Sequence, residues 1–205
     1  MTEHSLIQTL RRNLAGGPPP DNGSDAAVLI AILADGPEPE VLLTRRPAHM
    51  KSHAGEVAFP GGKRETGDAD LVATALRESD EEVGLAAGQV EILGALRPCR
   101  AKSGIKVVPI IGLVRQTPVL VANPCEVESV FRVPLRFFLE TQPTRDYRVT
   151  WRGLDLLVPC FRHGGYIIWG LTAHMLVEFA RHGLQHEIDY PWPPVLPGIL
   201  APGVR

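Results

Sequence analysis

The sequence predicts an α/β fold in which a mixed β-sheet is layered with helices. Three observations favour this class. Short apolar runs of strand-like composition are spread along the chain, an acid-rich amphipathic helix follows a glycine turn at Pro60-Gly61-Gly62, and another helix lies near the end. Strands interspersed with single helices in this way are typical of layered α/β domains.

The N-terminal part of the chain predicts a helix, a linker and a hairpin. His4–Leu14 carries apolar residues at helical spacing, and Ala15–Asp25 is rich in glycine and proline. Ala26–Ala34 and Glu40–Arg45 are strand-like and are separated by the turn residues Asp35-Gly36-Pro37. We therefore expect these two segments to pair as a hairpin.

The middle of the chain contains the glycine turn and the acidic helix. Glu56–Phe59 alternates in polarity and is expected to be extended. The helix is expected over Asp70–Val83, where Leu71 begins an apolar face, and it should end at Gly84 because glycine readily adopts the left-handed conformation that closes a helix.

The C-terminal half predicts the rest of the sheet and two more helices. Ile105–Arg115 is almost entirely apolar and should lie centrally in the sheet, after a loop at Cys99–Gly104. A short helix is expected at Pro134–Leu139 and a longer one at Leu171–His182, before an irregular tail from Pro191. The other extended segments are expected at Val90–Arg97, Val127–Val133, Tyr147–Val158 and Tyr166–Trp169.

Length and composition indicate one compact domain. The chain has 205 residues and is 44% hydrophobic, so we expect a helix and linker at 1–25, one domain at 26–185 and a proline-rich tail at 186–205. A net charge of −2 gives no electrostatic reason to expect binding to nucleic acid or to an anionic membrane. We expect neither a signal peptide nor a membrane span. The three cysteines lack paired spacing, which disfavours disulfides and suits a cytoplasmic protein.

The acidic helix carries the strongest chemical signal. Glu78 and Glu82 are four residues apart and lie one above the other on the helix, with Glu81 on the same flank. Like charges at this spacing destabilise a helix, and a hard divalent cation with oxygen ligands relieves the repulsion. A solvated acidic face is the alternative, but the adjacent glycine turn favours a metal site.

These residues resemble a known signature. Gly62, Asp68, Arg77-Glu78, Glu81-Glu82 and Gly84-Leu85 are similar to the signature of Nudix hydrolases, G-x5-E-x7-R-E-U-x-E-E-x-G-U, with U a bulky aliphatic residue. Three positions depart from it: Asp68 replaces glutamate, eight residues instead of seven precede Arg77, and Ser79 replaces an aliphatic residue. The resemblance implies a Nudix-type α/β/α sandwich and a Mg²⁺- or Mn²⁺-dependent hydrolase.

A second pattern lies just upstream. Leu42-Leu43-Thr44-Arg45-Arg46, Lys51, Gly55 and Phe59-Pro60-Gly61-Gly62 resemble the L-L-T-x-R-[S/A]-x3-R-x3-G-x3-F-P-G-G pattern of the coenzyme A pyrophosphatase branch. Pro47 and Lys51 are the departures, and lysine lacks the planar fork of arginine. The late segment Tyr166–Ala173 also resembles that branch. The substrate implied is coenzyme A or acyl-coenzyme A, cleaved to 3′,5′-ADP and (acyl-)4′-phosphopantetheine.

The resemblance and the residues together suggest roles. The metal ligands expected are Glu78, Glu81 and Glu82, and the family adds the backbone carbonyl at Gly61. Arg77 either orients a metal-binding glutamate or forms a structural salt bridge, and Asp68 either holds Arg77 or caps the helix. The general base is either Glu78 or a carboxylate from a later loop, for which Glu126 is our choice.

Substrate contacts are expected from a small basic cluster beside the turn. Arg45, Arg46 and Lys51 are candidates for binding substrate phosphates, with a solvated strand edge as the alternative, and Gly62 is expected to lie against the substrate. The partner is therefore a small nucleotide derivative, and a homodimer is compatible with the sequence. Two other functions remain open: hydrolysis of ADP-ribose, NADH or nucleoside triphosphates, and a catalytically silent nucleotide-sensing module.

Overall fold

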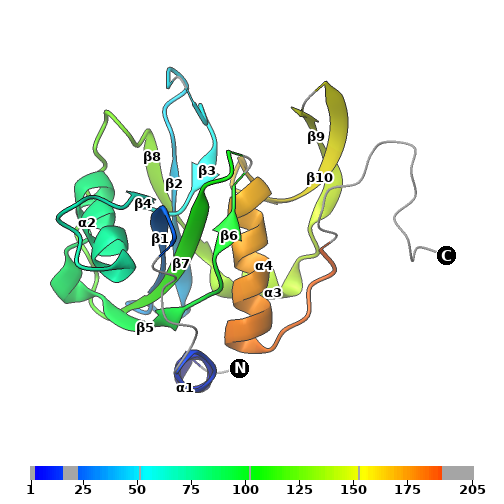
Figure 1. Ribbon diagram of the computed structural model, residues 1–205. Helices are drawn as coiled ribbons and strands as arrows, with labels where there is room; N and C mark the ends of the chain where they lie inside the picture. The colour runs from blue at the N-terminus through cyan, green and yellow to red at the C-terminus, as the bar shows by residue number, and fades with distance from the viewer. Residues whose placement is uncertain (1–2, 16–22, 51, 102, 152, 191–205) are drawn as a thin grey trace.

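The computed structural model describes residues 3–15, 23–50, 52–101, 103–151 and 153–190 (Figure 1). The helices are α1 (Glu3–Leu14), α2 (Leu71–Val83), α3 (Leu135–Glu140) and α4 (Gly170–Leu184), with a 3₁₀ turn at Ala87–Gln89. The strands are β1 (Ala26–Leu33), β2 (Glu40–Arg45), β3 (Val57–Ala58), β4 (Gly61–Lys63), β5 (Glu91–Ala95), β6 (Cys99–Arg100), β7 (Lys106–Val114), β8 (Ser129–Pro134), β9 (Thr144–Trp151), β10 (Leu154–His163) and β11 (Tyr166–Trp169).

The larger sheet is mixed, and β1 and β7 form its centre. These two strands run parallel and pair along the whole of β1, from Ala26 with Val107 to Leu33 with Val114. The other pairings in this sheet are antiparallel, in the main order β3-β2-β1-β7-β5, with β8 added to β2 and β6 to β7. The prediction of a central strand at 105–115 is confirmed, because a strand covered on both faces needs apolar residues at nearly every position.

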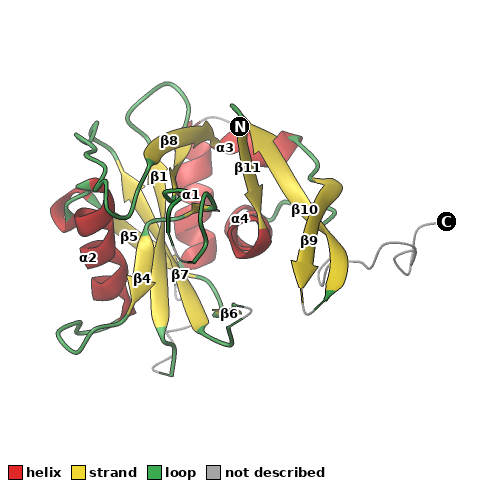
Figure 2. Cartoon of the chain, turned by 90° about the horizontal axis from the view of Figure 1, so that it is seen from above, coloured by secondary structure: helices red, strands yellow, loops and turns green. Residues whose placement is uncertain are grey.

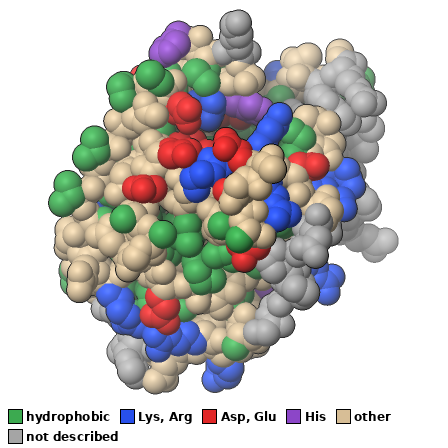
Figure 3. All heavy atoms as spheres, turned by 60° about the vertical axis from the view of Figure 1, so that its left-hand side comes forward, with side chains coloured by type: hydrophobic (Ala, Val, Ile, Leu, Met, Phe, Trp, Pro, Cys, Tyr) green, Lys and Arg blue, Asp and Glu red, His purple; other side chains and the backbone are tan. Residues whose placement is uncertain are grey.

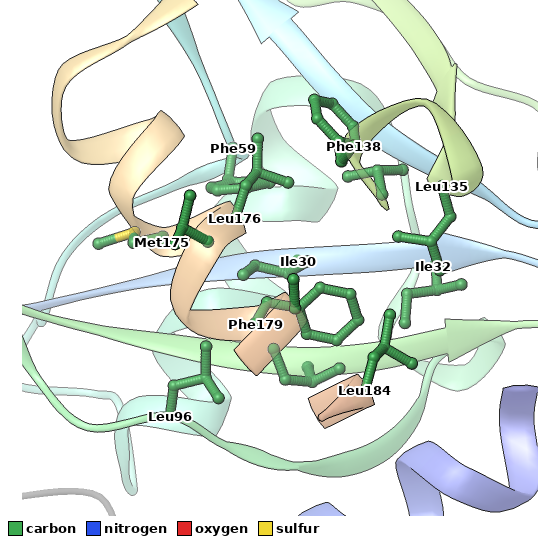
Figure 4. Close-up of a cluster of buried hydrophobic side chains, with 14 of the residues drawn as sticks. Ile30, Ile32, Phe59, Leu96, Leu135, Phe138, Met175, Leu176, Phe179 and Leu184 are labelled. Carbon is green, nitrogen blue, oxygen red and sulfur yellow. The ribbon is translucent and has the colours of Figure 1, made fainter. Parts of the chain in front are cut away.

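Helices cover both faces of this sheet, as Figures 1 and 2 show: α2 lies on one side, and α4 lies on the other. Alternate residues of β1 point to opposite faces, so Leu29 and Ala31 pack in the core beneath α2, whereas Ile30 and Ile32 pack in the core with α4. Figure 4 shows the second of these cores, with Phe179 of α4 beside Ile30. The predicted α/β/α sandwich with a mixed sheet is confirmed.

The ends of α2 are defined by two local signals. The Asp70 side chain accepts a hydrogen bond from the backbone N–H of Ala73 at 2.8 Å, which caps the N-terminus. Gly84 adopts a left-handed conformation with φ of 70° at the C-terminus, as predicted. Asp68 is therefore not the capping residue.

Three local predictions need correction. The glycine turn is part of a short strand, β4, which pairs with β1, and the expected loop at Cys99–Gly104 begins with β6, which pairs with β7. The segment expected to be extended at 147–158 reverses direction instead: β9 and β10 form an antiparallel hairpin, and Gly153 permits the turn with φ of 77°. The hairpin and β11 make a second, three-stranded sheet, which lies beyond α4 in Figure 2.

Helix α1 shares the core of the main domain. Leu6, Ile7, Leu10 and Leu14 are buried in the same cluster as the α4 residues. Leu10 lies so close to α4 that a Cβ placed on Gly183 would be 3.1 Å from its Cδ2 atom. At the other end, Ile188 and Tyr190 of the expected tail are also buried in this cluster, and the tail from residue 191 onward lies outside the described residues. No described helix has the length and hydropathy required to cross a bilayer.

The packing of α1 predicts a measurable loss of stability. Leu10→Ala removes a fully buried side chain, and we expect the free energy of unfolding to fall by about 2–4 kcal/mol in a denaturant titration followed by circular dichroism. Arg12→Ala, on the exposed side of the same helix, is the control and should change this value by less than about 0.5 kcal/mol. Equal losses in the two variants would contradict the packing of α1 on α4.

Candidate metal and phosphate site

Three carboxylates from two segments meet at the C-terminal half of α2. Glu78 and Glu82 project from the helix, and Glu126 comes from the loop between β7 and β8. One oxygen of each lies within 4.8 Å of an oxygen of each of the others. Figure 3 shows acidic and basic side chains gathered in the upper part of the molecule on the side where α2 lies. The structure thus brings Glu126 to the two helix glutamates, although more than forty positions separate them in the sequence.

The glycine turn lies directly against these carboxylates. The backbone N–H of Gly61 donates a hydrogen bond to Glu82 Oε2 at 3.2 Å. A Cβ placed on Gly62 would lie 2.4 Å from Glu78 Oε1, and one placed on Gly61 would lie 2.4 Å from the backbone oxygen of Ala27. Gly61 therefore requires glycine, because a side chain there would meet the backbone of β1, whereas a side chain at Gly62 would displace the Glu78 carboxylate.

Burial and mutual repulsion raise the pKa values of the two helix carboxylates, Glu78 and Glu82. Burial raises the pKa of Glu82 to about 7, the nearby Glu78 and Glu126 add to the rise, and the Gly61 amide opposes it. Burial also raises the pKa of Glu78, against the effect of the adjacent Arg77 guanidinium. A cluster of oxygen donors whose negative charges repel one another suits a hard divalent cation, so these residues fit Mg²⁺ or Mn²⁺.

Arg77 ties this cluster to the loop that precedes α2. Its Nε and Nη2 atoms donate to the two oxygens of Asp68 at 3.0 and 3.1 Å, and its Nη1 donates to Glu78 Oε1 at 3.1 Å and to Glu81 Oε2 at 2.9 Å. Nη2 also donates to the backbone oxygen of Lys63 in β4. Hydrogen bonds from Arg77 hold the pKa of Asp68 well below its usual range. Of the two roles considered for Asp68, the structure favours holding Arg77.

The residues that hold Asp68 were not identified from the sequence. Asp68 Oδ2 accepts hydrogen bonds from the backbone N–H of Glu65 and from the hydroxyl of Thr74, both at 2.9 Å. Thr74 is fully buried, and a hydroxyl on the buried face of an amphipathic helix is the one signal that could have pointed to it. The additional residue between Asp68 and Arg77 does not interrupt the helix, which begins only at Leu71.

Glu81 and Ser79 behave differently from the buried acids. Glu81 is half-exposed and pairs with Arg77, and it lies outside the group of three carboxylates. Its assignment as a metal ligand remains a prediction. Ser79, which replaces an aliphatic residue of the signature, is fully buried, and its hydroxyl donates to the backbone oxygen of Ala75 at 2.7 Å. The substitution therefore leaves no unsatisfied polar group in the helix.

The predicted basic cluster is only partly described. Arg45 forms an ion pair with Glu128 at 3.3 Å. Arg46 contributes a favourable charge interaction to the Glu82 carboxylate, and its Nε is buried without a hydrogen-bond acceptor among the described residues. Lys51 lies outside the described residues. An unsatisfied buried guanidinium N–H beside a carboxylate cluster is suited to an oxyanion such as phosphate.

The late segment Tyr166–Ala173 lies against the strand that leads to the turn. The Thr172 hydroxyl donates to the backbone oxygen of Val57 in β3 at 2.9 Å, and the Tyr166 hydroxyl donates to Ser129 Oγ in β8 at 3.2 Å. The Tyr166 ring also stacks on Phe131 with ring centroids 3.7 Å apart. These contacts hold β3, which leads to the glycine turn, and β8, which follows the loop that carries Glu126.

Comparisons with known proteins identify a family for most of the chain. The NUDIX domain family model matches residues 23–150. An uncharacterized Nudix hydrolase, NudL, from Photorhabdus laumondii is 42% identical over 168 residues, which is 80% of this chain and 89% of that protein. The same protein from Yersinia pestis is 42% identical over 156 residues, or 76% of this chain and 78% of that protein.

Among solved structures, a Caenorhabditis elegans Ap4A hydrolase binary complex is 20% identical. The match covers 54% of this chain and 80% of that chain, with a TM-score of 0.47.

The raised pKa of Glu82 predicts how stability depends on pH without metal. Between about pH 4.5 and 7 the folded protein retains a proton that the unfolded chain has released, so stability falls as the pH rises through this window, by about 3 kcal/mol. Glu82→Gln cannot ionise and should escape this loss.

We expect the stability of Glu82→Gln relative to wild type, measured by chemical denaturation in EDTA, to increase from pH 5 to pH 8. A difference between the two proteins that is constant over this range would show that Glu82 is not perturbed. Glu140→Gln, on an exposed part of α3, is the control and should show no such trend.

Proposed function

The chain belongs to the NUDIX family and is a hydrolase of phosphorus-containing anhydrides, and on this basis we propose that its substrate is coenzyme A or acyl-coenzyme A. Cleavage of the diphosphate would give 3′,5′-ADP and 4′-phosphopantetheine or its acyl form. The proposal combines two separate supports. The carboxylate cluster supports the chemistry, and the pattern upstream of the turn supports the choice of substrate.

The observation that carries the proposal is the convergence of Glu78, Glu82 and Glu126 at the glycine turn. A bound divalent cation supplies charge neutralisation for the diphosphate and lowers the pKa of an attacking water. In this proposal Glu78 and Glu82 hold the cation, with Glu81 and the Gly61 carbonyl as further candidates. Arg77 fixes the orientation of Glu78 through its contact with Asp68.

Glu126 is proposed to accept the proton of the attacking water. It lies on the loop between β7 and β8 and so reaches the cluster from a segment other than α2. Glu78 is the alternative base, but the hydrogen bond from Arg77 favours its ionised, fixed form as a ligand. Because the base lies on a different segment from the ligands, it can accept the proton while Glu78 and Glu82 keep their positions.

The basic residues are proposed to bind substrate phosphates. Arg46 offers a buried N–H without an acceptor among the described residues, close enough to Glu82 to influence its ionisation. The Arg45 side chain is 43% exposed and is paired with Glu128, so it is suited to a phosphate farther from the cluster. At Gly62 the Glu78 carboxylate fills the place of a side chain, so the proposed substrate contact there is made by the backbone. Lys51 is the third member that the upstream pattern implies.

A product assay tests the function directly. Purified protein is incubated with Mg²⁺ and, separately, with coenzyme A, dephospho-coenzyme A, ADP-ribose and NADH, and the products are resolved by chromatography. We expect coenzyme A to be the preferred substrate and 3′,5′-ADP to be released. Preference for ADP-ribose or NADH would replace the proposed substrate, and nucleotide binding without turnover would indicate a sensing module.

Glu82→Gln should reduce turnover in this assay by at least about 10²-fold, because it removes a charge that holds the cation. Glu140→Gln removes a carboxylate from an exposed site on α3 and should retain the wild-type rate. A Glu82→Gln protein that is folded and fully active would exclude this residue as a ligand.

Arg46→Ala tests the phosphate contact. If Arg46 binds a phosphate equally in the ground state and the transition state, the substitution should raise KM by about tenfold and change kcat much less. The matched control is Arg12→Ala, which removes the same charge from the exposed side of α1. Steady-state kinetics with the preferred substrate measure both values, and an unchanged KM would place Arg46 away from the substrate.

A further inference from the structure

The loop that carries Glu126 is fastened to the C-terminal end of α2. The backbone N–H groups of Val121 and Asn123 donate to the backbone oxygens of Val83 and Glu82, both at 2.9 Å. Carbonyls in the last turn of a helix have no partner within the helix, so the loop satisfies them. Glu82 is therefore bound twice: its carboxylate accepts from the glycine turn, and its backbone oxygen accepts from the Glu126 loop.

Asn123 makes the turn that leads from this attachment to Glu126. Its side-chain Oδ1 accepts a hydrogen bond from the backbone N–H of Cys125 at 3.1 Å. Its backbone oxygen accepts from Glu126 at 3.0 Å and from Val127 at 2.8 Å. Asparagine favours this turn because its short amide imitates a backbone carbonyl, and the following Pro124 restricts the backbone further.

Packing holds this loop on either side of residues 123–126: before them, Ala122 lies against the core beneath α2. Pro124 and Cys125 are exposed, so they bury little apolar surface. The next attachments are downstream, where Val127 is buried and the Glu128 N–H donates to the Arg45 backbone oxygen at 2.8 Å. Between the packed residues Ala122 and Val127, the hydrogen bonds made by Asn123 set the path of the chain that carries Glu126.

From these contacts we infer that Asn123 is a positioning residue, which holds the Glu126 carboxylate against Glu78 and Glu82. This inference rests on the proposed function, because it assigns Glu126 to the same site. Asn123 acts through Glu126 and touches neither the substrate nor the cation. A substitution of Asn123 should therefore have no effect in a protein whose residue 126 has lost its carboxylate charge.

A double-mutant cycle tests this dependence. Asn123→Ala removes the Oδ1 acceptor, Asn123→Asp keeps an acceptor at that position, and Glu126→Gln removes the carboxylate charge. These variants and the combined Asn123→Ala/Glu126→Gln protein are made in the full chain. Two quantities are measured for each: the affinity for Mn²⁺ alone, by electron paramagnetic resonance of the free ion, and the turnover of coenzyme A with Mg²⁺.

We expect Asn123→Ala to lower Mn²⁺ affinity, turnover or both by about five- to tenfold, the size expected for losing one hydrogen bond. Asn123→Asp should stay within about twofold of wild type. In the Glu126→Gln background the alanine substitution should change either quantity less than twofold. The inference is overturned if Asn123→Ala matches wild type in both measurements, or if it costs as much with Glu126→Gln as without it. If wild-type protein binds Mn²⁺ but hydrolyses no diphosphate, the proposed function fails, and the Mn²⁺ cycle alone decides the role of Asn123.

Discussion

The burial of the Glu82 carboxylate beside two other acids is the constraint on which the site depends. Only 4% of Glu82 is exposed, and its pKa is raised to about 7. An ionised group in such a place is costly unless a partner stabilises it. The Gly61 N–H provides one hydrogen bond, but Glu78 and Glu126 add further negative charge. The arrangement lowers stability near neutral pH, and it suits a protein that binds a divalent cation there.

The fold produces this arrangement through β1. Strand β1 carries β4, and hence the glycine turn, on one end and supports α2 from below with small and apolar residues such as Ala27 and Ala31. Because both α2 and β4 contact the same strand, the turn can lie within hydrogen-bond distance of Glu82. A side chain at Gly61 would collide with β1, and one at Gly62 would collide with Glu78. Gly61 follows from this close packing against β1, and Gly62 leaves the Glu78 carboxylate in its place.

Local signals in the sequence predicted the elements, whereas contacts between distant segments were harder to predict. The extent of α2 and the central place of β7 follow from apolar spacing and from Gly84, which act within a few residues. Glu126 was chosen as a loop carboxylate that could serve as the general base, with Glu78 as the alternative, and the structure places it at the cluster. The β4 strand was missed because its three residues read as a turn, and it is a strand only through pairing with β1. The β9–β10 hairpin was missed because the turn at Gly153 was not recognised within a segment that reads as extended.

The Asp68–Arg77 pair forms in this chain although Asp68 departs from the family signature in residue type and in spacing. Aspartate is one methylene shorter than the usual glutamate, and an extra residue separates it from the arginine. Asp68 lies before the first residue of α2, in the preceding loop, and Thr74 and the Glu65 N–H hold one of its oxygens. Both oxygens of Asp68 accept hydrogen bonds from Arg77. The other N–H groups of Arg77 donate to Glu78, to Glu81 and to the backbone of β4. A bidentate pair of this kind fixes the guanidinium plane, and that plane in turn sets the direction of Glu78. The loop that carries Asp68 ends before α2 begins at Leu71, and a motif of fixed spacing does not describe this arrangement.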